Sequence, residues 1–306
     1  MATENKTTTL TQLMQTYYDK LFLDTPKKEL RLQQFAQMRS VPKNSGKIVY
    51  FTQYTALAGA TTALTEGSNP AGSALSATTV SATLAGYGDF TQTSDLVALT
   101  AIDAQLKEKT EIFSQQSAET IETLIANQLS ADFTSYNSNS VADLTAMAAT
   151  DTLDATDIKK VVRALKVAKA QKFSDGYLVG VVNPYVSYDL QNDSEWIDAQ
   201  KYGSNNGSGL YDGEIGKLGG VRFVEATETS TQESSVTLQH TYIFGKNSFG
   251  AVRLSDYAKK IMHYVPGTDE TSNPLNMFST YGWKLYLANK VLNDAWGYTI
   301  RSGYTA

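Results

Sequence analysis

The stretch Leu99 to Ala131, LTAIDAQLKEKTEIFSQQSAETIETLIANQLSA, decides the fold of this chain. Its apolar side chains recur at steps of three, four, seven and eight residues, which places them on one stripe of a helix. They are Ile102, Leu106, Phe113, Ile121, Leu124, Ile125 and Leu129. No Pro or Gly interrupts the pattern. The stretch therefore predicts one helix of about 33 residues, which at about 1.5 Å per residue is about 50 Å long.

A helix of that length is longer than a compact domain of about 150 residues is wide. It predicts either the spine of an elongated body or one arm of a coiled coil. The stripe drifts away from strict heptad positions. Ser114, Ser117 and Ala118 are also too small for a continuous zipper seam. We therefore favour the spine.

The composition is typical of an ordinary globular protein. Of the 306 residues, 42% are hydrophobic and 19% are charged, which is sufficient for one large or two medium domains. The formal net charge is −5 and no block of five or more Lys or Arg occurs, so a nucleic-acid-wrapping surface is not expected. The absence of cysteine excludes disulfides, thiolate metal sites and cysteine nucleophiles.

Residues 1–25 contain no apolar run of the kind that forms a signal-peptide core. No segment approaches the run of about 18 apolar residues that a membrane-spanning helix requires. We therefore expect a cytoplasmic product that does not span a membrane.

Before the long helix, the period of the pattern changes to two. Residues 47–54 and 79–84 alternate as β-strands do. Between them, residues 56–79 carry few large apolar side chains, and loops of this length in compact domains are uncommon and usually functional. The large apolar side chains there are Leu57, Leu64 and Leu75. The pattern predicts an extended hairpin that a neighbouring molecule covers, with a flexible linker as the alternative.

After the long helix, residues 155–255 show the order helix, strand, helix and further strands, which is typical of an α+β domain. A helix is expected after an N-cap at Thr156 or Asp154, and Asn183-Pro184 is expected to begin another. The strands are expected at residues 177–182, 221–224, 236–244 and 249–254. One side of the first helix carries basic residues, which we interpret as a solvated face in preference to a phosphate-binding surface. These residues are Lys159, Lys160, Arg163, Lys166, Lys169 and Lys172.

The C-terminal region alternates over residues 283–288 and again from Trp296, with Asn293-Asp294 between the two runs. This pattern predicts a long β-hairpin whose aromatic side chains pack along the stripe of the long helix. The expected core of the spine helix consists of Leu106, Phe113, Ile121, Leu129, Trp283 and Leu285.

No constellation of residues indicates catalysis. His240 and His263 lie within strand patterns and are interpreted as structural residues, and two histidines without cysteine cannot form the common zinc sites. A phosphate loop ending at Gly216-Lys217 would require Gly at position 211 and Ser or Thr at 218, where the chain has Tyr211 and Leu218. The glycines of this segment, Gly213, Gly216, Gly219 and Gly220, are interpreted as turn residues. We expect no catalytic residue, no cofactor, no metal and no enzyme activity.

Several short segments resemble a known family. They are Thr61 to Gly67, Tyr87 to Phe90 with Ser94-Asp95, Tyr185 to Leu190 followed by Trp196, Gly213 to Phe223, Asn273 to Leu275 and Gly282 to Lys284. With the order of the parts, they resemble the major capsid proteins of tailed double-stranded-DNA bacteriophages with the Hong Kong 97 fold. The similarity is closest to the subfamily typified by coliphage N-four and covers residues 45–295. The run GEIGKLGGVRF at Gly213 to Phe223 is its most specific part.

The resemblance implies an α+β, Hong Kong 97-like capsid fold. The implied parts are an N-terminal arm at 1–45, an extended β-hairpin loop at 46–97, a peripheral domain with the spine helix at 98–150, an axial domain at 151–258 and peripheral return strands at 259–306. The extended loop is expected to lie on an adjacent subunit. Its expected contact residues are Leu57, Thr61, Thr62, Leu64, Thr65, Glu66 and Leu75.

The resemblance also implies a partner set. The chain would assemble with itself into hexamers and pentamers and form an icosahedral shell. The shell would enclose double-stranded DNA without sequence-specific binding, and scaffold, portal and decoration proteins would be further partners. The protein would be found in the virion capsid after assembly in the bacterial host cytoplasm.

Two other classes of function remain at this stage. The richness in Thr, Ala, Ser and Gly is compatible with a secreted surface-layer or adhesive binding protein, although the sequence shows no export route. An enzyme is the third class, and it is disfavoured because no acid/base constellation stands out. The assembly hypothesis predicts that deletion of residues 58–76 leaves a soluble monomer that does not assemble.

Overall fold

The computed structural model describes residues 30–42, 44, 46–55, 57–64, 66–67, 69, 72–100, 105–203, 214–254, 260–264 and 275–305. The predicted N-terminal arm therefore lies largely outside the described residues. Its described end contains a short 3₁₀ helix, η2 (Gln33–Phe35), followed by a strand.

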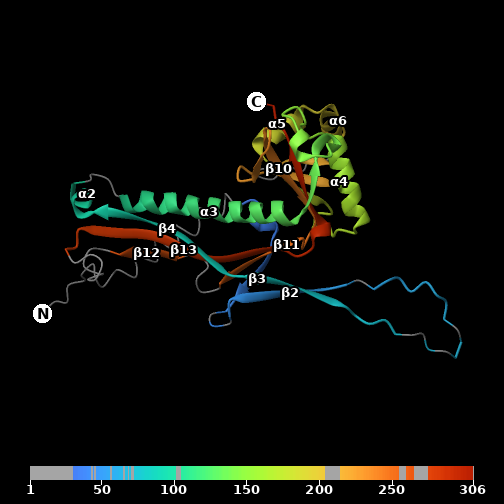
Figure 1. Ribbon diagram of the computed structural model, residues 1–306, viewed down its shortest axis with the longest axis horizontal. Helices are drawn as coiled ribbons and strands as arrows, with labels where there is room; N and C mark the ends of the chain where they lie inside the picture. Colours follow the sequence, from blue (N-terminus) through green and yellow to red (C-terminus); the bar gives the residue numbers. More distant parts are fainter. Residues whose placement is uncertain are drawn as a thin grey trace.

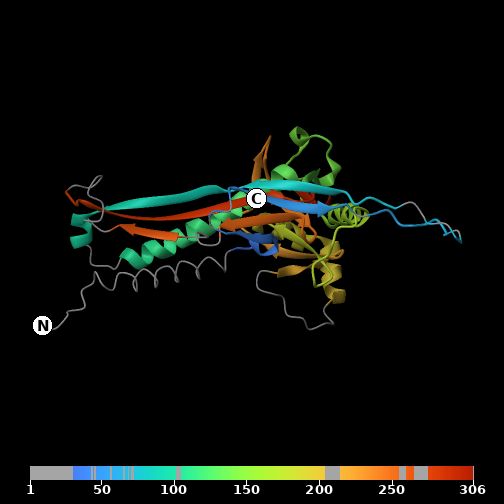
Figure 2. The ribbon, with the colours of Figure 1, turned by 90° about the horizontal axis from the view of Figure 1, so that it is seen from below.

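Two separate sheets and a projecting hairpin make up the α+β fold (Figure 1). A long, flat body holds the five-stranded sheet beside the long helix. The second, more compact body lies at one end of that helix and holds the seven-stranded sheet with its own helices. The hairpin extends away from both bodies, as Figure 2 also shows. We refer to the two bodies as the elongated body and the compact body.

The sheet of the elongated body has its longest strand at the centre. Its strands are β1 (Gln37–Val41), β4 (Ala85–Ser94), β11 (Phe249–Leu254), β12 (Lys260–Tyr264) and β13 (Phe278–Val291). On one side, β4 pairs with β13 over ten residues, from Ala85 opposite Leu287 to Ser94 opposite Phe278. On the other side, β13 pairs first with β12 and then with β11, to which β1 is added in parallel. The sequence patterns did not predict β4 as a strand.

The predicted spine is present as α3 (Gln105–Asp132). Its 28 residues span about 42 Å at about 1.5 Å per residue. A separate short helix, α2 (Asp95–Thr100), precedes it, and residues 101–104 lie outside the described part of the chain. Figure 1 shows α3 running alongside β4 and β13, so the long helix forms the spine of an elongated body.

The apolar stripe of α3 is buried against β13. Phe113, Ile121 and Leu129 belong to the same buried cluster as Trp283 and Leu285 of β13. The ring of Phe113 stacks on that of Tyr281 with 5.5 Å between their centroids. The small residues of the helix, Ser114, Ser117 and Ala118, are fully buried, so they let the helix approach the sheet closely where a zipper would need larger side chains. Leu106 lies in α3, but its side chain is outside the described part of the structure.

The far end of α3 continues beneath the compact body. The hydroxyl of Tyr242 donates to the carbonyl oxygen of Ala126 at 3.0 Å, and the hydroxyl of Thr299 donates to that of Leu129 at 3.3 Å. The Phe133 ring lies 6.3 Å from that of Phe244. One helix therefore supports both sheets and fixes their relative position.

The sheet of the compact body has helices on one face and the end of α3 on the other. Its strands are β5 (Thr134–Asn137), β6 (Leu178–Val182), β7 (Glu214–Leu218), β8 (Val221–Glu225), β9 (Thr231–Glu233), β10 (Thr237–Phe244) and β14 (Gly297–Ser302). The helices are α4 (Ala155–Val167), α5 (Pro184–Asn192) and α6 (Ser194–Gly203), and the 3₁₀ helices are η3 (Ser138–Ser140), η4 (Leu144–Ala146) and η6 (Asp294–Trp296).

Local sequence signals correctly predicted the starts of α4 and α5 in this body. The Asp154 carboxylate caps α4 by accepting from the Asp157 amide, and Asn183 caps α5 with Pro184 in the first turn. Strand β6 is buried on both faces, as its continuous apolar run predicted.

The predicted C-terminal hairpin is wrong. Residues 278–291 form the central strand of the elongated body, whereas β14 pairs with β10 and β5 of the compact body. The sheets therefore also divide the chain differently from the predicted ranges. Strands β5 and β14, expected in the peripheral parts at 98–150 and 259–306, lie in the sheet of the compact body. Strand β11, expected in the axial part at 151–258, lies in the sheet of the elongated body.

Candidate functional site

The projecting hairpin is the part of the molecule with the least support from its own chain. Strands β2 (Ile48–Tyr54) and β3 (Ala77–Thr83) pair in register from Ile48 opposite Thr83 to Tyr54 opposite Ala77. One more bond follows, from the Thr55 amide to the Ser76 carbonyl oxygen at 2.8 Å. Beyond it, the two arms of the loop extend away from the molecule (Figure 1). This agrees with the hairpin predicted from the alternating runs at 47–54 and 79–84, whereas residues 85–94 of the extended loop expected at 46–97 form β4 of the elongated body.

Large apolar side chains on this hairpin face solvent. Those that are exposed are Ile48, Tyr50, Tyr54, Leu57, Leu64 and Leu75, and the exposed fraction reaches 76% at Leu64 and 70% at Leu75. A row of exposed apolar groups on an extended hairpin marks a surface that another molecule covers.

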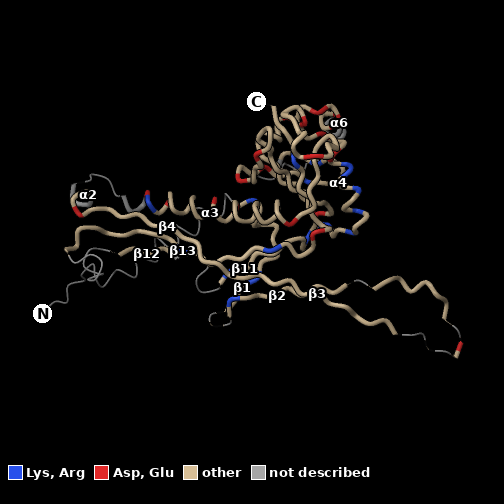
Figure 3. Tube along the Cα trace, in the orientation of Figure 1, with Lys and Arg blue, Asp and Glu red and all other residues tan. Residues whose placement is uncertain are grey.

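The hairpin is almost free of charge. Glu66 is the single charged residue between Lys47 and Asp89, and Figure 3 shows an acidic position at the tip of the loop. A surface with one charge has little electrostatic penalty for burial. The hairpin is therefore suited to contact another protein along most of its length.

The root of the hairpin is anchored firmly to the elongated body. Phe51 of β2 is 3% exposed and belongs to a buried cluster with Val252 of β11 and Ala288 of β13. The guanidinium of Arg39 lies 4.5 Å from the centre of the Phe51 ring and donates to the Tyr50 carbonyl oxygen at 3.1 Å. This anchoring fixes the direction in which the hairpin projects.

An open groove of about 820 Å³ lies beside this root. Phe51, Tyr54 and Arg39 line one wall, and Lys169 and Trp296 of the compact body line the other. The groove combines aromatic rings with the Arg39 side chain, and both kinds of residue are enriched at protein–protein interfaces.

The predicted contact residues lie on the loop beyond the paired strands. Leu57, Thr61, Thr62, Leu64, Glu66 and Leu75 are all exposed. Thr65 lies outside the described residues. Contact of these side chains with a second copy stays a prediction.

The glycines of the 213–220 segment have different roles. Gly219 and Gly220, with φ of +62° and +96°, form the turn between β7 and β8. Gly216 lies within β7, where the register with β8 shifts. Gly213 lies outside the described residues.

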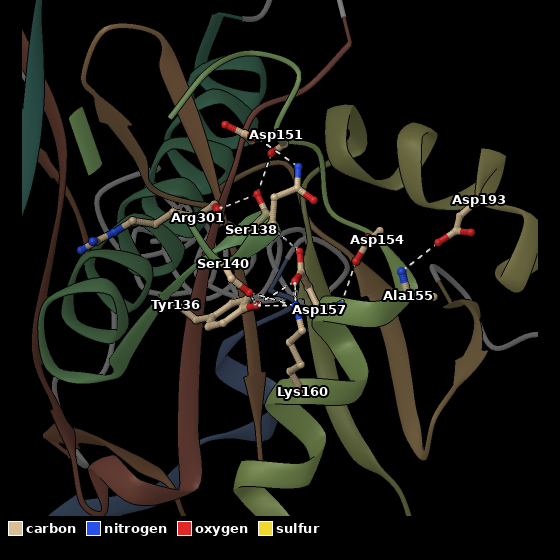
Figure 4. A network of polar contacts seen from close by, with 11 residues as sticks. Tyr136, Ser138, Ser140, Asp151, Asp154, Ala155, Asp157, Lys160, Asp193 and Arg301 are labelled. Atoms are coloured by element: carbon tan, nitrogen blue, oxygen red, sulfur yellow. Dashed lines mark hydrogen bonds and ion pairs between the residues drawn. The ribbon is translucent and has the colours of Figure 1, made fainter. Parts of the chain in front are cut away.

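A polar network fixes the start of α4 to the neighbouring turn (Figure 4). The buried carboxylate of Asp157 accepts from the Tyr136 hydroxyl at 2.7 Å and from the Asn139 amide at 2.8 Å, and Lys160 lies 3.3 Å away. Asn139 and Ser140 both have positive φ, at 55° and 59°. This left-handed conformation is uncommon for residues other than glycine, and the bond from the Asn139 amide to Asp157 stabilises it.

A second set of bonds in Figure 4 ties the same turn to the end of the chain. The Ser138 hydroxyl lies 2.6 Å from the Asp151 carbonyl oxygen and 3.2 Å from that of Arg301. The Ala155 amide donates to the Asp193 carboxylate at 2.8 Å. Helix α4 is thus held by β5, β14 and the segment before α6, so its outer face is presented rigidly.

That outer face was interpreted from the sequence only as a solvated surface. Lys159, Arg163 and Lys166 are exposed, and Figure 3 shows basic residues along the outer edge of α4. The position of this face beside the hairpin depends on the fold, so no local pattern could have indicated it.

The histidines are packed within the fold. His240 of β10 is 4% exposed, and burial, reinforced by the charge of Arg301, lowers its pKa to about 4. Its Nδ1 atom lies 2.7 Å from the Ser230 hydroxyl. His263 of β12 packs against the Tyr281 ring, with 5.6 Å between the ring centroids. Both lie in strands, as their sequence patterns indicated.

Among the described residues, no group of three or more His, Cys, Asp or Glu side chains is placed to hold a metal ion. No helix in the described part of the chain has both the length and the apolar character needed to cross a membrane.

Solved phage capsids resemble this fold. The capsid structure of cyanophage P-SCSP1u is 17% identical with a TM-score of 0.64, covering 89% of this chain and 86% of that chain. The capsid of Ralstonia phage GP4 is 12% identical with a TM-score of 0.69, covering 89% and 88%. The capsid of Helicobacter pylori bacteriophage KHP30 is 11% identical with a TM-score of 0.62, covering 87% of each. The fold is therefore Hong Kong 97-like.

The sequence itself carries a family assignment. No curated protein matches it. The family described as phage capsid protein matches residues 84–250, which is more than half of the chain. This match does not favour a surface-layer or adhesive protein. The chain belongs to the phage capsid protein family, and it is a major capsid protein, a structural protein of the virion shell.

Proposed function

We propose that copies of this chain assemble with one another into hexamers and pentamers, and that these form the icosahedral head around double-stranded DNA. The observation that carries the proposal is the hairpin, which is anchored at its root by Phe51 and projects exposed apolar side chains such as Leu64 into solvent. An uncovered arm of this kind has little stability alone, so a neighbouring copy is its natural partner.

The two bodies have complementary roles in this proposal. The compact body, built on β6 and β10, would point toward the centre of each hexamer or pentamer as the axial domain. The elongated body with α3 and β13 would form the peripheral domain. The anchored root sets the direction of the hairpin, while the loop beyond Thr55 can adapt to the small curvature differences between positions in a shell.

We further propose membership of the subfamily typified by coliphage N-four. The support is the resemblance at Gly213 to Phe223, together with the shorter segments at Thr61 to Gly67 and Gly282 to Lys284. A sequence alignment that groups this chain with that subfamily, apart from other phage capsid proteins, is the check on this assignment.

The proposed partners follow from the shell. With a net charge of −5 and no basic tract, the chain would line a DNA container without binding the DNA strongly, which would ease packaging and ejection. Scaffold, portal and decoration proteins are the other proposed partners, and the host cytoplasm is the proposed place of assembly. The role is non-enzymatic and requires no cofactor.

Electron microscopy of the purified full chain tests the proposal. Closed particles, or rings with six and five subunits, are the expected result under conditions that favour assembly. A chain that stays strictly monomeric and compact over a range of concentration, salt and added crowding agent would contradict it. Fractionation of expressing cells tests the alternative, since a surface-layer protein would be recovered outside the cytoplasm.

A further inference from the structure

Charge is segregated along this chain. Residues 110–158 contain eight acidic residues and no Lys or Arg. The next segment, residues 159–172, contains six basic residues and no acidic one. A third segment, between Arg222 and Lys246, contains three glutamates and no Lys or Arg. Because acidic and basic residues lie in separate segments, the fold can place opposite charges on different faces of the molecule.

The basic segment forms the outer face of α4. Lys159, Arg163 and Lys166 are exposed and line an open depression of about 480 Å³ together with Val167, which is 78% exposed. Lys159 is paired with Glu195 of α6. Within the part of the chain that the structure describes, neither Arg163 nor Lys166 forms an ion pair. We call Lys159, Arg163, Lys166 and Val167 the basic face.

The acidic segments meet on the other side of the compact body. Glu228 lies against α3, because its side chain hydrogen-bonds to that of Thr123; burial, and after it the charge of Glu119 on α3, raise the pKa of Glu228. The segment that follows stays on this side, because the Ser230 hydroxyl lies 2.6 Å from the hydroxyl of Tyr242, which bonds to α3. We call Glu119 and Glu228 the acidic face.

The pleat of the sheet shows that these two faces are opposite each other. Val179 and Val181 of β6 pack into the cluster that contains α3, whereas Leu178 and Val182 pack into the cluster that contains α4. Successive side chains of a strand point to opposite faces of the sheet. The basic face therefore lies on one side of the compact body, and the α3 part of the acidic face lies on the other.

The direction of the hairpin indicates which side of one copy faces the next copy in a ring. Figure 1 shows it projecting on the side where α4 lies, and Figure 3 shows the basic residues of α4 on that same side. In a ring of identical subunits, every contact joins one side of a copy to the opposite side of the next. The hairpin and the basic face of one copy would thus both contact the same neighbouring copy, on the side of that neighbour where its α3 lies.

We propose that the basic face of α4 docks on the acidic face of the next copy in the ring, beside the hairpin that reaches the same neighbour. This inference rests on the proposed function. Arg163 and Lys166 meet Glu119 and Glu228 of the second copy, and these charge pairs set the direction and register of subunits within a capsomer. Opposed charges steer association and disfavour the reversed arrangement, which would bring like charges together.

Charge reversal of each face tests the docking. One variant carries Arg163→Glu and Lys166→Glu, a second carries Glu119→Lys and Glu228→Lys, and a third carries all four changes. Particles are counted by electron microscopy, and the mass distribution is measured in solution. Each two-residue variant is expected to lose at least about tenfold in particle yield, and the four-residue variant is expected to recover most of it. Higher ionic strength should weaken wild-type assembly, since salt screens exposed charges.

The control variant conserves charge at the same positions, with Arg163→Lys and Lys166→Arg, and should assemble as the wild type does. Circular dichroism of each variant shows whether it is folded. If both faces tolerate reversal without loss of particles, or if the four-residue variant stays unassembled while folded, the docking is wrong and the proposed function stands. If the wild type never assembles, the proposed function fails and the docking fails with it.

Discussion

The indole N–H of Trp283 on β13 donates a 2.8 Å hydrogen bond to the side-chain oxygen of Gln116 on α3. The nitrogen of the same amide donates to the Asp89 carboxylate on β4 at 2.7 Å. One side chain therefore joins the spine helix to two neighbouring strands. Because Trp283 is 3% exposed, its N–H has little access to water as an alternative acceptor.

Gln116→Leu should destabilise the chain by about 1–3 kcal/mol, because it leaves a buried indole N–H without an acceptor. Urea unfolding of the unassembled chain measures the change in the free energy of unfolding. Gln115→Leu is the matched control on the adjacent, exposed position of α3, and should change stability by less than about 0.5 kcal/mol. Equal effects of the two substitutions would show that the bond to Trp283 contributes nothing.

The buried carboxylate of Glu122 connects α3 to the described end of the N-terminal arm. It is 2% exposed and accepts from the amides of Leu32 at 2.7 Å and Gln33 at 3.1 Å. Burial raises its pKa from 4.5 to about 7, while the backbone bonds oppose that rise and the charge of Glu228 adds to it. The folded chain therefore holds a proton at this site over a pH range in which the unfolded chain has lost it.

Stability should fall as the pH rises from about 4.5 to about 7, since the folded state binds more protons there. A shift of this size corresponds to about 3 kcal/mol at most. Glu122→Gln should remove this contribution, so the variant should lose less stability than the wild type between about pH 5 and about pH 8. Urea midpoints at both pH values measure it, with exposed Glu111→Gln as the control. Parallel pH profiles of wild type and Glu122→Gln would contradict the assignment.

The local sequence was informative where the hydrophobic period of a single element determines which of its faces is buried. The 3.6-residue spacing of Phe113, Ile121 and Leu129 indicates the face of α3 that is buried in the structure. In the same way, Asp154 and Asn183 show where α4 and α5 begin, because a cap requires only a few neighbouring residues.

The pairing of strands that are distant in the sequence could not be predicted from the sequence. Asn293 and the residues after it resemble a hairpin turn, yet the chain there passes from one sheet to the other, and only the pairing of β14 with β10 decides this. Strand β4 was missed because Gly86 and Gly88 interrupt its alternation. The small size of these glycines is explained only by the folded structure, in which β13 lies beside them. The side of the molecule on which the basic residues of α4 lie is likewise set only by the fold.

Gly88 permits the close approach of β4 and β13. A Cβ atom at this position would collide with the carbonyl oxygen of Trp283, so Gly88→Ala requires a backbone shift and should cost about 1–3 kcal/mol. Gly59 in the hairpin has no atom within 4 Å of such a Cβ, so Gly59→Ala should leave stability unchanged or slightly raised. Thermal unfolding of both variants compares them, and a fully stable Gly88→Ala chain would show that the two strands have room to separate.

Asp157 should be necessary for the left-handed turn at Asn139 and Ser140. Asp157→Ala removes the acceptor of the Tyr136 hydroxyl and of the Asn139 amide, and should cost about 1–3 kcal/mol. Thr156→Ala, at an exposed neighbouring position of α4, is the control. Hydrogen exchange at the Asn139 amide gives a direct readout, since it should be slow in the wild type and faster in Asp157→Ala. Unchanged exchange there would mean that other contacts hold the turn.

Deletion of residues 58–76 should separate folding from assembly. It removes the loop beyond the paired strands but leaves Phe51 and the anchored root of the hairpin in place, so the monomer should stay soluble and folded. Electron microscopy should show no closed particles, because the surface proposed to cover the next copy is gone. Replacement of the same residues by a Gly/Ser segment of equal length should also block assembly if exposed side chains such as Leu64 and Leu75 make the contacts. If the Gly/Ser variant assembles and the deletion variant does not, assembly requires the length of the loop and not its side chains. Normal particles from the deletion variant would show that the loop is not part of the assembly surface.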